Sequence, residues 1–479
     1  MSTRAARLMR WRAGLVAVGM LAVAACADDS NEDTSAPAAD DAGDADVAGW
    51  LHLGFDLANT RAATDESIVG PDNVGSLEPA WELADVNGVT GTPIVADGVL
   101  YVGDWSGHVR ALDAVGGDER WSTDLGADYI GGALAVDGSR VFAGTSDARL
   151  VALDRESGER VWEERVDDHP MASIDGSPVQ TDGLVIVGVS SFENFVEDVD
   201  EYTFRGSVVA LDAESGEELW RYRATTGDEG AGVGIWSSPA VDTERGHVYI
   251  GTGQHYVGPA SERSDAVVAL DVTTGELQWA HQYTEGDIWS VNHPDGPHVD
   301  VGAPPNLFQV DGTGAVGAGD KAGVYKALDR ETGDELWSQD LTDGSLLGGV
   351  MASAAVVDGT IFVASNRGGA EADLIALDAD AGDERWRVDV GANVVGPVTW
   401  ANDVVYVADN TGRISGFDAR DGRLVWSHEV DAQASGGVAV VDGTVYAGWG
   451  WWFPGTEPDD PEGGLIAFRP GGATPDDGT

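Results

Sequence analysis

A short phrase recurs along the chain and constrains its fold more than any other feature. The phrase begins with Ala-Leu-Asp, reaches a glycine about four residues later and ends on a tryptophan. Its copies are ALDAVGGDERW (111–121), ALDRESGERVW (152–162), ALDAESGEELW (210–220), ALDVTTGELQW (269–279), ALDRETGDELW (327–337), ALDADAGDERW (376–386) and the degraded GFDARDGRLVW (416–426). A repeat spaced by roughly 40–60 residues indicates a solenoid or a propeller.

The residues between these copies predict strands. Upstream of each copy lies an apolar run, a polar pair such as Asp-Gly, and a second apolar run, as in TPIVADGVLYVG (92–103). This is the pattern of a β-hairpin. Each unit therefore predicts four strands, a to d, with the glycine in the c–d turn and the tryptophan on strand d. Units of this kind are typical of a β-propeller.

The ends of the repeat give the number of blades and predict how the ring closes. Strands a to c of an eighth unit are present at 436–448 and 464–470, but no tryptophan strand follows them. EPAWEL (78–83) stands before the first complete unit and supplies the missing strand d. The sequence thus predicts an all-β, eight-bladed β-propeller of four-stranded antiparallel blades, closed by an N-terminal strand with no open sheet edge. We expect the repeated tryptophans to pack between neighbouring blades.

Insertions point to one face of this propeller. They follow strand b at 191–204, 254–264 and 449–463, and strand d at 221–234, 280–302 and 338–351. In a propeller both kinds of connection emerge on the same face, which we call the loop face. Loops that grow on one face of a rigid scaffold are typical of a binding or catalytic site.

The first 48 residues have the composition of an export signal. Four arginines precede an apolar run (13–25) that is too short for a stable membrane span, and the run ends at Cys26. Val23-Ala24-Ala25-Cys26 resembles a bacterial lipobox; the alternative is an ordinary export signal with a chance cysteine. We expect a lipoprotein signal peptide at 1–25, lipidation at Cys26, an acidic flexible tether at 26–48, the propeller at 49–469 and a disordered tail at 470–479.

Charge and cysteine content exclude several functions. The formal net charge is −56, from 83 acidic and 27 basic residues, so the chain repels nucleic acid. Cys26 is the single cysteine, which leaves the propeller without a disulfide or a Cys-x-x-Cys-His haem site.

Several unusual residues fall on the loop face. Lys321 and Lys326 are the two lysines of the chain; by its place in the repeat Lys321 belongs to the loop face, whereas Lys326 is expected to face solvent. Glu193 and Gln254 follow b strands of adjacent blades, and such oxygens could begin a Ca²⁺ site. Trp236 could stack on a planar cofactor. Each of these residues could equally be an ordinary solvated loop side chain.

The ordered segments resemble a known family. GWLHLGFDLANTR (49–61), DDHPMASIDGSPV (167–179), TFRGSVVALDAESGE (203–217) and DKAGVYKALD (320–329) are similar to those of the quinoprotein alcohol dehydrogenase superfamily, in its polyvinyl-alcohol-dehydrogenase-like branch. Its members are eight-bladed propellers that bind pyrroloquinoline quinone (PQQ). The resemblance covers roughly residues 49–469.

The resemblance implies roles for individual residues. Glu193 matches the acidic calcium ligand, Trp236 the tryptophan beneath the cofactor ring, Gln254 the position of a calcium-binding asparagine, and Lys321 the basic residue that contacts the quinone carbonyls. The family's base is missing from its usual place, where this chain has Trp289-Ser290, and Asp287 is the nearest carboxylate. Two further departures are the absent adjacent-cysteine disulfide and Asp175, which replaces a hydroxyl residue.

Two functions follow as hypotheses. The first is an extracytoplasmic dehydrogenase, lipid-anchored outside the bacterial cell membrane or periplasmic. It would oxidise alcohols, secondary or polymeric ones included, with PQQ and calcium, and pass electrons to an external acceptor such as a cytochrome c. The second is a non-catalytic propeller lipoprotein that holds a protein or carbohydrate, with GWGWWFP (448–454) as an aromatic contact patch.

Overall fold

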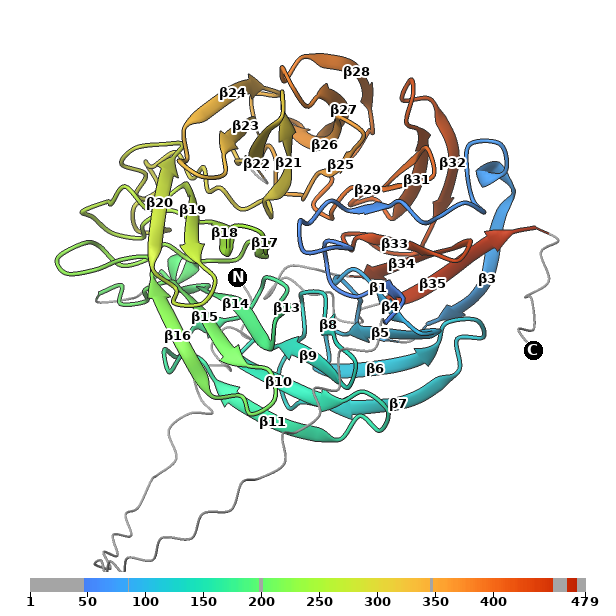
Figure 1. Cartoon of the computed structure of the whole chain (residues 1–479), viewed down its shortest axis with the longest axis horizontal. Coiled ribbons are helices and arrows are strands. Elements are labelled where there is room, and N and C mark those ends of the chain that lie inside the picture. The colour runs from blue at the N-terminus through green and yellow to red at the C-terminus, as the bar shows by residue number, and fades with distance from the viewer. Residues whose placement is uncertain (1–46, 85, 198–200, 345–347, 451–462, 472–479) are drawn as a thin grey trace, which may run out of the picture.

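Eight antiparallel sheets form a ring in the computed structural model, which describes residues 47–84, 86–197, 201–344, 348–450 and 463–471 (Figure 1). The predicted eight-bladed propeller is confirmed. In the described residues helix is limited to two 3₁₀ turns, η1 (Val74–Ser76) and η2 (Glu193–Phe195).

The strands follow the chain blade by blade, from the axis outward. Blade one consists of β4 (Ile94–Ala96), β5 (Val99–Gly103), β6 (His108–Asp113) and β7 (Glu119–Asp124). Blade two consists of β8 (Ala135–Val136), β9 (Arg140–Gly144), β10 (Arg149–Asp154) and β11 (Arg160–Arg165). Blade three consists of β13 (Val179–Thr181), β14 (Leu184–Ser191), β15 (Ser207–Asp212) and β16 (Glu218–Arg223), and β12 (Ala172–Ser173) also pairs with β14. Blades four and five are β17 (Ala240–Asp242), β18 (His247–Gly251), β19 (Ala266–Asp271), β20 (Leu277–Gln282); and β21 (Asn306–Val310), β22 (Thr313–Gly319), β23 (Val324–Asp329), β24 (Glu335–Asp340). Blade six consists of β25 (Ala355–Val357), β26 (Thr360–Arg367), β27 (Glu371–Asp378) and β28 (Glu384–Asp389). Blade seven consists of β29 (Thr399–Ala401), β30 (Val404–Ala408), β31 (Arg413–Asp418) and β32 (Leu424–Glu429). Blade eight consists of β33 (Val438–Val441), β34 (Thr444–Gly450), β35 (Gly463–Pro470) and β3 (Leu77–Leu83).

The ring closes as the sequence predicts. Strand β3, from the N-terminal region, pairs antiparallel with β35, and Trp81 lies opposite Ala467 in the register. The outer strand of the last blade therefore comes from the other end of the domain, which removes the open edge of the eighth sheet.

The repeated tryptophans join neighbouring blades. The Trp220 indole nitrogen donates to the carbonyl of Val272 in the next blade at 2.9 Å, and its ring covers Gly275 in the c–d turn there. Gly275 has φ +69°, and a Cβ on it would lie 2.4 Å from the Trp220 ring. The phrase that recurs in the sequence thus encodes an interface in which glycine supplies both the left-handed turn and the space for the indole.

A strap formed by residues 48–63 occupies the central channel. Its carbonyls accept hydrogen bonds from backbone N–H groups of six blades, those of Asp97, Val136, Val241, Leu307, Val356 and Trp400. Its Arg61 is fully buried and donates to the carbonyls of Val398 and Val438 and to the Thr399 hydroxyl. The strap, which includes β1 (Gly49–Trp50) and β2 (Ala62–Ala63), thus runs along the inner strands of six blades.

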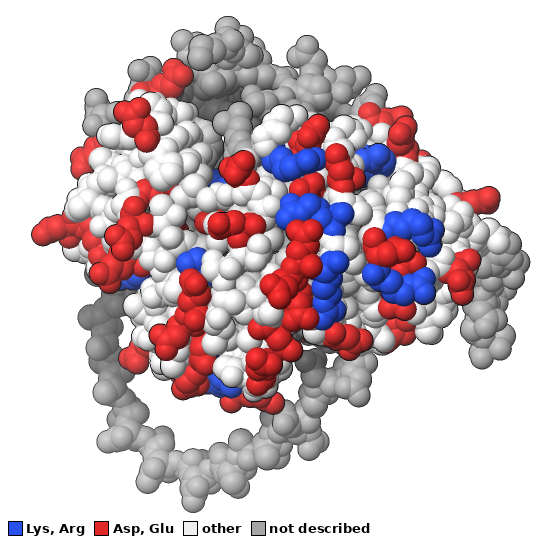
Figure 2. Space-filling view, turned by 90° about the horizontal axis from the view of Figure 1, so that it is seen from above, with Lys and Arg blue, Asp and Glu red and all other residues white. Residues whose placement is uncertain are grey.

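The side of the ring that Figure 2 shows is predominantly acidic. In the edge-on view of Figure 2, Asp and Glu side chains outnumber Lys and Arg, and the basic side chains lie among acidic ones. Arg110, for example, pairs with Asp104 and Glu119. Within the described part of the chain, no helix has the length and apolarity needed to cross a bilayer.

Candidate functional site

A cavity of about 310 Å³ lies on the propeller axis at the loop face. The segments that enter the inner strands of all eight blades line it with, in chain order, Thr90, Gly131, Asp175, Trp236, Asp300, Met351, Val395 and Ser435. A volume near 300 Å³ with mainly apolar walls and a few polar groups is typical of a small-molecule site.

Lys321 reaches this cavity and is held by an ion pair. The residue follows β22, and its backbone N–H donates to the carbonyl of Asp300. Its ammonium Nζ lies 2.5 Å from Asp300 Oδ2 and 3.1 Å from His298 Nε2. The Asp300 side chain is 4% exposed and that of Lys321 13%, so the pair is largely removed from water.

Lys321 influences the pKa values of both Asp300 and His298. Burial by itself would raise the pKa of the Asp300 carboxyl, but the charge of Lys321 and the neighbouring His298 outweigh it and the pKa is lowered. Burial and Lys321 together lower the pKa of His298 to about 4. At neutral pH the cluster therefore holds an ionised Asp300, a charged Lys321 and a neutral imidazole that accepts the lysine's hydrogen bond.

Trp236 forms an aromatic wall beside this cluster. Lys321 Nζ lies 5.2 Å from the centroid of its ring, within range of a cation–π contact. Gly302 packs against the far edge of the indole so closely that a Cβ there would lie 1.7 Å from the ring. The glycine after the Asp300 segment thus lets the indole take this position.

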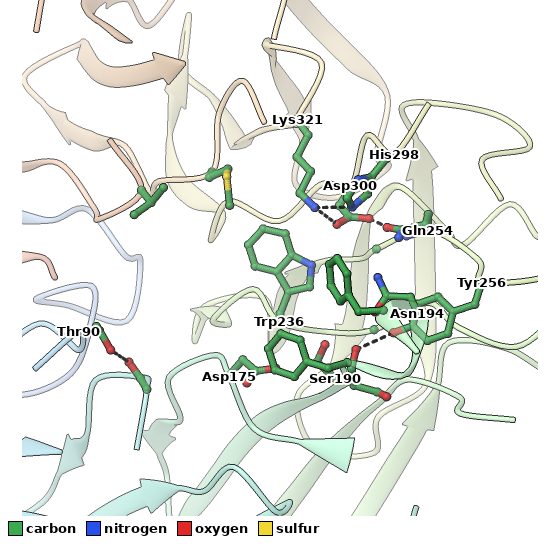
Figure 3. Close-up of a pocket in the computed structure, with 18 of the residues that line it drawn as sticks. Thr90, Asp175, Ser190, Asn194, Trp236, Gln254, Tyr256, His298, Asp300 and Lys321 are labelled. Carbon is green, nitrogen blue, oxygen red and sulfur yellow. Dashed lines mark hydrogen bonds and ion pairs between the residues drawn. The ribbon is translucent and has the colours of Figure 1, made fainter. Parts of the chain in front are cut away.

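Amide and carboxylate oxygens gather on the same side of Trp236, as Figure 3 shows for Asn194, Gln254 and Asp300. Asn194 lines the cavity, and its side-chain oxygen is buried without a hydrogen-bond partner. In the orientation that satisfies its neighbours, the Gln254 amide donates from its nitrogen to the Asp300 carboxylate.

Three of the five predicted site residues line the cavity, and two lie behind its wall. Trp236, Gln254 and Lys321 come together as expected. The Glu193 carboxylate accepts the backbone N–H groups of Thr203 and Phe204 and lies 3.3 Å from His169. These contacts outweigh burial and lower its pKa.

Asp287 is the second residue behind the wall. It is fully buried, and its carboxylate accepts the backbone N–H groups of His298 and Val299. It supports the turn on which His298 and Asp300 stand, and burial raises its pKa. The carboxylate that borders the cavity beside Lys321 is Asp300.

Another polar group lies farther from Lys321, near Tyr129 and Trp105. Tyr129 stacks on Trp105 with ring centroids 4.6 Å apart, and its hydroxyl donates to Asp175 Oδ1 at 3.1 Å. Ser173 Oγ donates to Asp175 Oδ2 at 2.7 Å. Asp175 borders the cavity without an ion pair in the described structure.

Sequence reasoning missed Asp300, His298 and Asn194. Asp300 and His298 lie in the same insertion (280–302) as Asp287. Because this insertion does not follow the repeat, the sequence does not show which of its carboxylates borders the cavity. Asp300 could have been identified by its position two residues before Gly302, where the chain leaves the insertion and approaches the inner strand of the next blade. Asn194 adjoins the predicted Glu193, and the η2 turn decides which of the two faces the cavity.

Known proteins resemble this chain in sequence and fold. A family model described as "Glucose/ethanol/alcohol dehydrogenase, beta-propeller domain" matches residues 50–342, and one described as "Outer membrane protein assembly factor BamB" matches residues 320–472. A polyvinylalcohol dehydrogenase from Pseudomonas sp is 30% identical over 458 residues, covering 83% of this chain and 72% of the relative. One from Sphingopyxis sp. (strain 113P3) is 27% identical over 88% of this chain and 74% of its own.

Solved structures share the architecture. The quinohemoprotein alcohol dehydrogenase of Comamonas testosteroni matches with a TM-score of 0.74 at 21% identity, over 89% of this chain and 81% of that one. A europium-containing methanol dehydrogenase matches with a TM-score of 0.75 at 18% identity, over 88% of this chain and 98% of that one. These two likenesses concern the fold.

Proposed function

The chain belongs to the PQQ-dependent alcohol dehydrogenase family, and on that premise we propose that it oxidises alcohols with PQQ and calcium and passes the electrons to a separate acceptor. One observation carries the proposal. An ionised Asp300 and the ammonium of Lys321 meet beside the Trp236 indole, in an axial cavity that opens to the loop face.

This end of the cavity offers contacts for the planar ring of a quinone. Trp236 offers an aromatic surface on which a fused ring can stack. The Lys321 ammonium can donate to carbonyl oxygens, because two of its hydrogens point to Asp300 and His298 and one remains. When bound, PQQ supplies the two-electron acceptor for the hydrogen removed from the alcohol carbon.

Oxygen donors in the cavity support a calcium site. Within the described residues no group of three or more His, Cys, Asp or Glu side chains is arranged to hold a metal, so amide oxygens have to contribute. Asn194 brings an unpartnered buried oxygen, and Gln254 and Asp300, which line the same cavity, bring an amide and a carboxylate. Calcium accepts such mixed oxygen ligands. We propose this set, with Glu193 holding the turn that presents Asn194.

We propose Asp300, rather than Asp287, as the base that accepts the hydroxyl proton of the alcohol. Oxidation of an alcohol to a carbonyl releases two electrons and two protons, and the hydroxyl proton needs an acceptor within hydrogen-bonding reach. Asp300 borders the cavity and is ionised at neutral pH because Lys321 lowers its pKa. Lys321 also fixes the carboxylate's position, and neutral His298 accepts a hydrogen bond from Lys321 without adding charge.

The finer points of the proposal come from the relatives and the composition. Two relatives are named polyvinylalcohol dehydrogenases, so we propose a secondary or polymeric alcohol as substrate. The given sequence holds one cysteine and no Cys-x-x-Cys-His haem site, and we propose a separate electron acceptor such as a cytochrome c. Export and lipidation at Cys26 remain part of the proposal, and Cys26 lies outside the described residues.

Cofactor binding tests the proposal directly. Purified full-length protein is titrated with PQQ in the presence of Ca²⁺, tryptophan fluorescence is followed, and alcohol-dependent reduction of a dye is then measured. We expect saturable binding in the micromolar range or below and dye reduction that requires both additions. Absence of PQQ binding would refute the proposal and favour the non-catalytic scaffold, whose aromatic patch at 448–454 falls largely outside the described residues.

A further inference from the structure

Another pocket lies at the outer rim of the loop face, between blades two and three. Its volume is about 380 Å³, and it shares no lining residue with the axial cavity. Residues 165–169 line it from blade two, and residues 203–205 and two positions of β16 line it from blade three. Four of its ten lining residues are arginines, Arg165, Arg205, Arg221 and Arg223. In a chain with 83 acidic and 27 basic residues, this concentration of positive charge needs an explanation.

The arginines reverse a charge that the repeat carries in other blades. The last residue of the outer strand is acidic in four blades: Asp124 in β7, Asp340 in β24, Asp389 in β28 and Glu429 in β32. The same position is Arg165 in β11 and Arg223 in β16, and these two blades are neighbours in the ring. Because the fold accepts an acid at this position, blade packing does not account for the two arginines.

Strand geometry brings the three arginines of blade three to one face. Arg221 and Arg223 are two residues apart on β16, so their side chains leave the same face of the sheet. Ser207 of β15 pairs with Arg223 in the register, and Arg205 lies two residues before Ser207. Arg221 Nη1 donates to the Ser207 hydroxyl at 3.2 Å. The three guanidinium groups thus meet Arg165 of blade two in one pocket.

Two of these four arginines have no carboxylate partner among the described residues. Arg165 and Arg221 each form an ion pair with a carboxylate. Arg205 donates to neutral oxygens, the Thr225 hydroxyl at 2.8 Å and a backbone carbonyl. Arg223 is exposed and has neither an ion pair nor a side-chain hydrogen bond within the described part of the chain. Both Arg205 and Arg223 therefore keep N–H donors that a ligand can engage.

Two carboxylates in the lining limit what the pocket can bind. Asp167 and Asp168 lie beside the arginines, and Asp167 accepts the backbone N–H of His169 at 2.8 Å. They repel any anion, so binding requires more charge and more acceptor oxygens than a single carboxylate has. A phosphate group carries about two negative charges and several strong acceptor oxygens. Guanidinium forks match its geometry, and here they approach from two blades.

We propose that this pocket binds a phosphate dianion, free or as the terminal group of a phosphate monoester, with Arg205 and Arg223 supplying the principal donors. The site is separate from the proposed dehydrogenase site and does not require PQQ. Its test therefore gives a result whether or not the protein oxidises alcohols.

Isothermal titration calorimetry of the full-length protein tests the site, with inorganic phosphate, glycerol 3-phosphate and acetate as probes at low ionic strength and about pH 8. We expect one saturable phosphate site per chain and weaker binding of acetate. Arg205→Gln and Arg223→Gln should each weaken phosphate binding by about tenfold or more. Arg223→Asp, which introduces the acid found in other blades, should abolish it. Asp168→Asn removes a repelling charge and should strengthen it.

Arg423→Gln is the matched control, because Arg423 is 62% exposed in blade seven and the substitution changes the total charge equally. It should leave the affinity unchanged, and Arg223→Gln should keep the Tm of the unaltered protein, since Arg223 is exposed and unpaired in the described structure. Tighter binding of glycerol 3-phosphate supports a monoester as the ligand, and equal affinity supports the free ion. The proposal is overturned if neither phosphate probe saturates, if acetate binds as tightly, or if Arg423→Gln weakens binding as much as Arg223→Gln.

Discussion

Replacing Lys321 by alanine tests the buried ion pair at the centre of the site. The substitution leaves the Asp300 carboxylate, 4% exposed, without its counter-ion. Removing one partner of a buried pair costs about 3–5 kcal/mol of the free energy of unfolding, because the remaining charge is buried and uncompensated. In a folded domain of this size that corresponds to a fall in Tm of about 3–5 °C.

The loss of stability should depend on pH. With Lys321 present the pKa of Asp300 is lowered, so the pair stabilises the protein above the ordinary carboxyl range and this contribution fades as pH falls through the lowered pKa. Without Lys321, burial is the dominant influence and raises that pKa. The variant then gains a proton on folding, and its stability falls as pH rises. The difference in Tm between the two proteins should therefore grow from pH 5 to pH 8.

Differential scanning fluorimetry from pH 5 to pH 8 checks this reasoning, and the other lysine provides the control. Lys326 pairs with Glu335, which is 39% exposed, so Lys326→Ala should cost at most about 1 kcal/mol. The double variant Lys321→Ala/Asp300→Asn removes both charges and should recover part of the lost stability. The reasoning fails if Lys321→Ala costs no more than Lys326→Ala, or if its cost is the same at every pH.

Three further predictions concern the blades and the chemistry. Gly275→Ala should lower the free energy of unfolding by about 1–3 kcal/mol more than Gly312→Ala does, as measured by thermal unfolding. Both glycines have positive φ, but Gly275 faces the Trp220 ring whereas Gly312 has open space around it. Equal losses in the two variants would contradict the proposed packing of Trp220 on Gly275. Asp300→Asn should lower kcat by about 10²–10⁴-fold with PQQ still bound, and a smaller loss would exclude it as the base. Removing calcium with EGTA should abolish the rise in Tm that PQQ causes, and Ca²⁺ should restore it better than Mg²⁺; a rise that survives EGTA would exclude the proposed ligands.

Much of the architecture could be predicted from the sequence because it is encoded locally and repeatedly. The c–d turn glycine and the strand-d tryptophan recur in the same phrase, so each copy repeats the same information about blade packing. The closure of the ring by β3 followed from a strand missing at one end of the repeat and present at the other. The insertions indicated the loop face, and the cavity lies there, lined by the entry segments of all eight blades.

The strap and the polar groups of the site required the tertiary structure. No sequence pattern in residues 48–63 predicts that their carbonyls accept hydrogen bonds from six blades, because the donors are distant in sequence. Asp287 and Asp300 share one irregular insertion, and Glu193 and Asn194 are neighbours. Which carboxylate or amide borders the cavity depends on the path of the backbone through a turn.

The sequence by itself therefore determined the ring, its closure and the face that carries the site, since strand periodicity and turn chemistry act over a few residues. Only the tertiary structure decided that Asp300 pairs with Lys321 and that Asp175 has no cationic partner among the described residues. Those pairings arise where loops from different blades converge on the axis, and their energies come from burial and mutual distance, which no local pattern records.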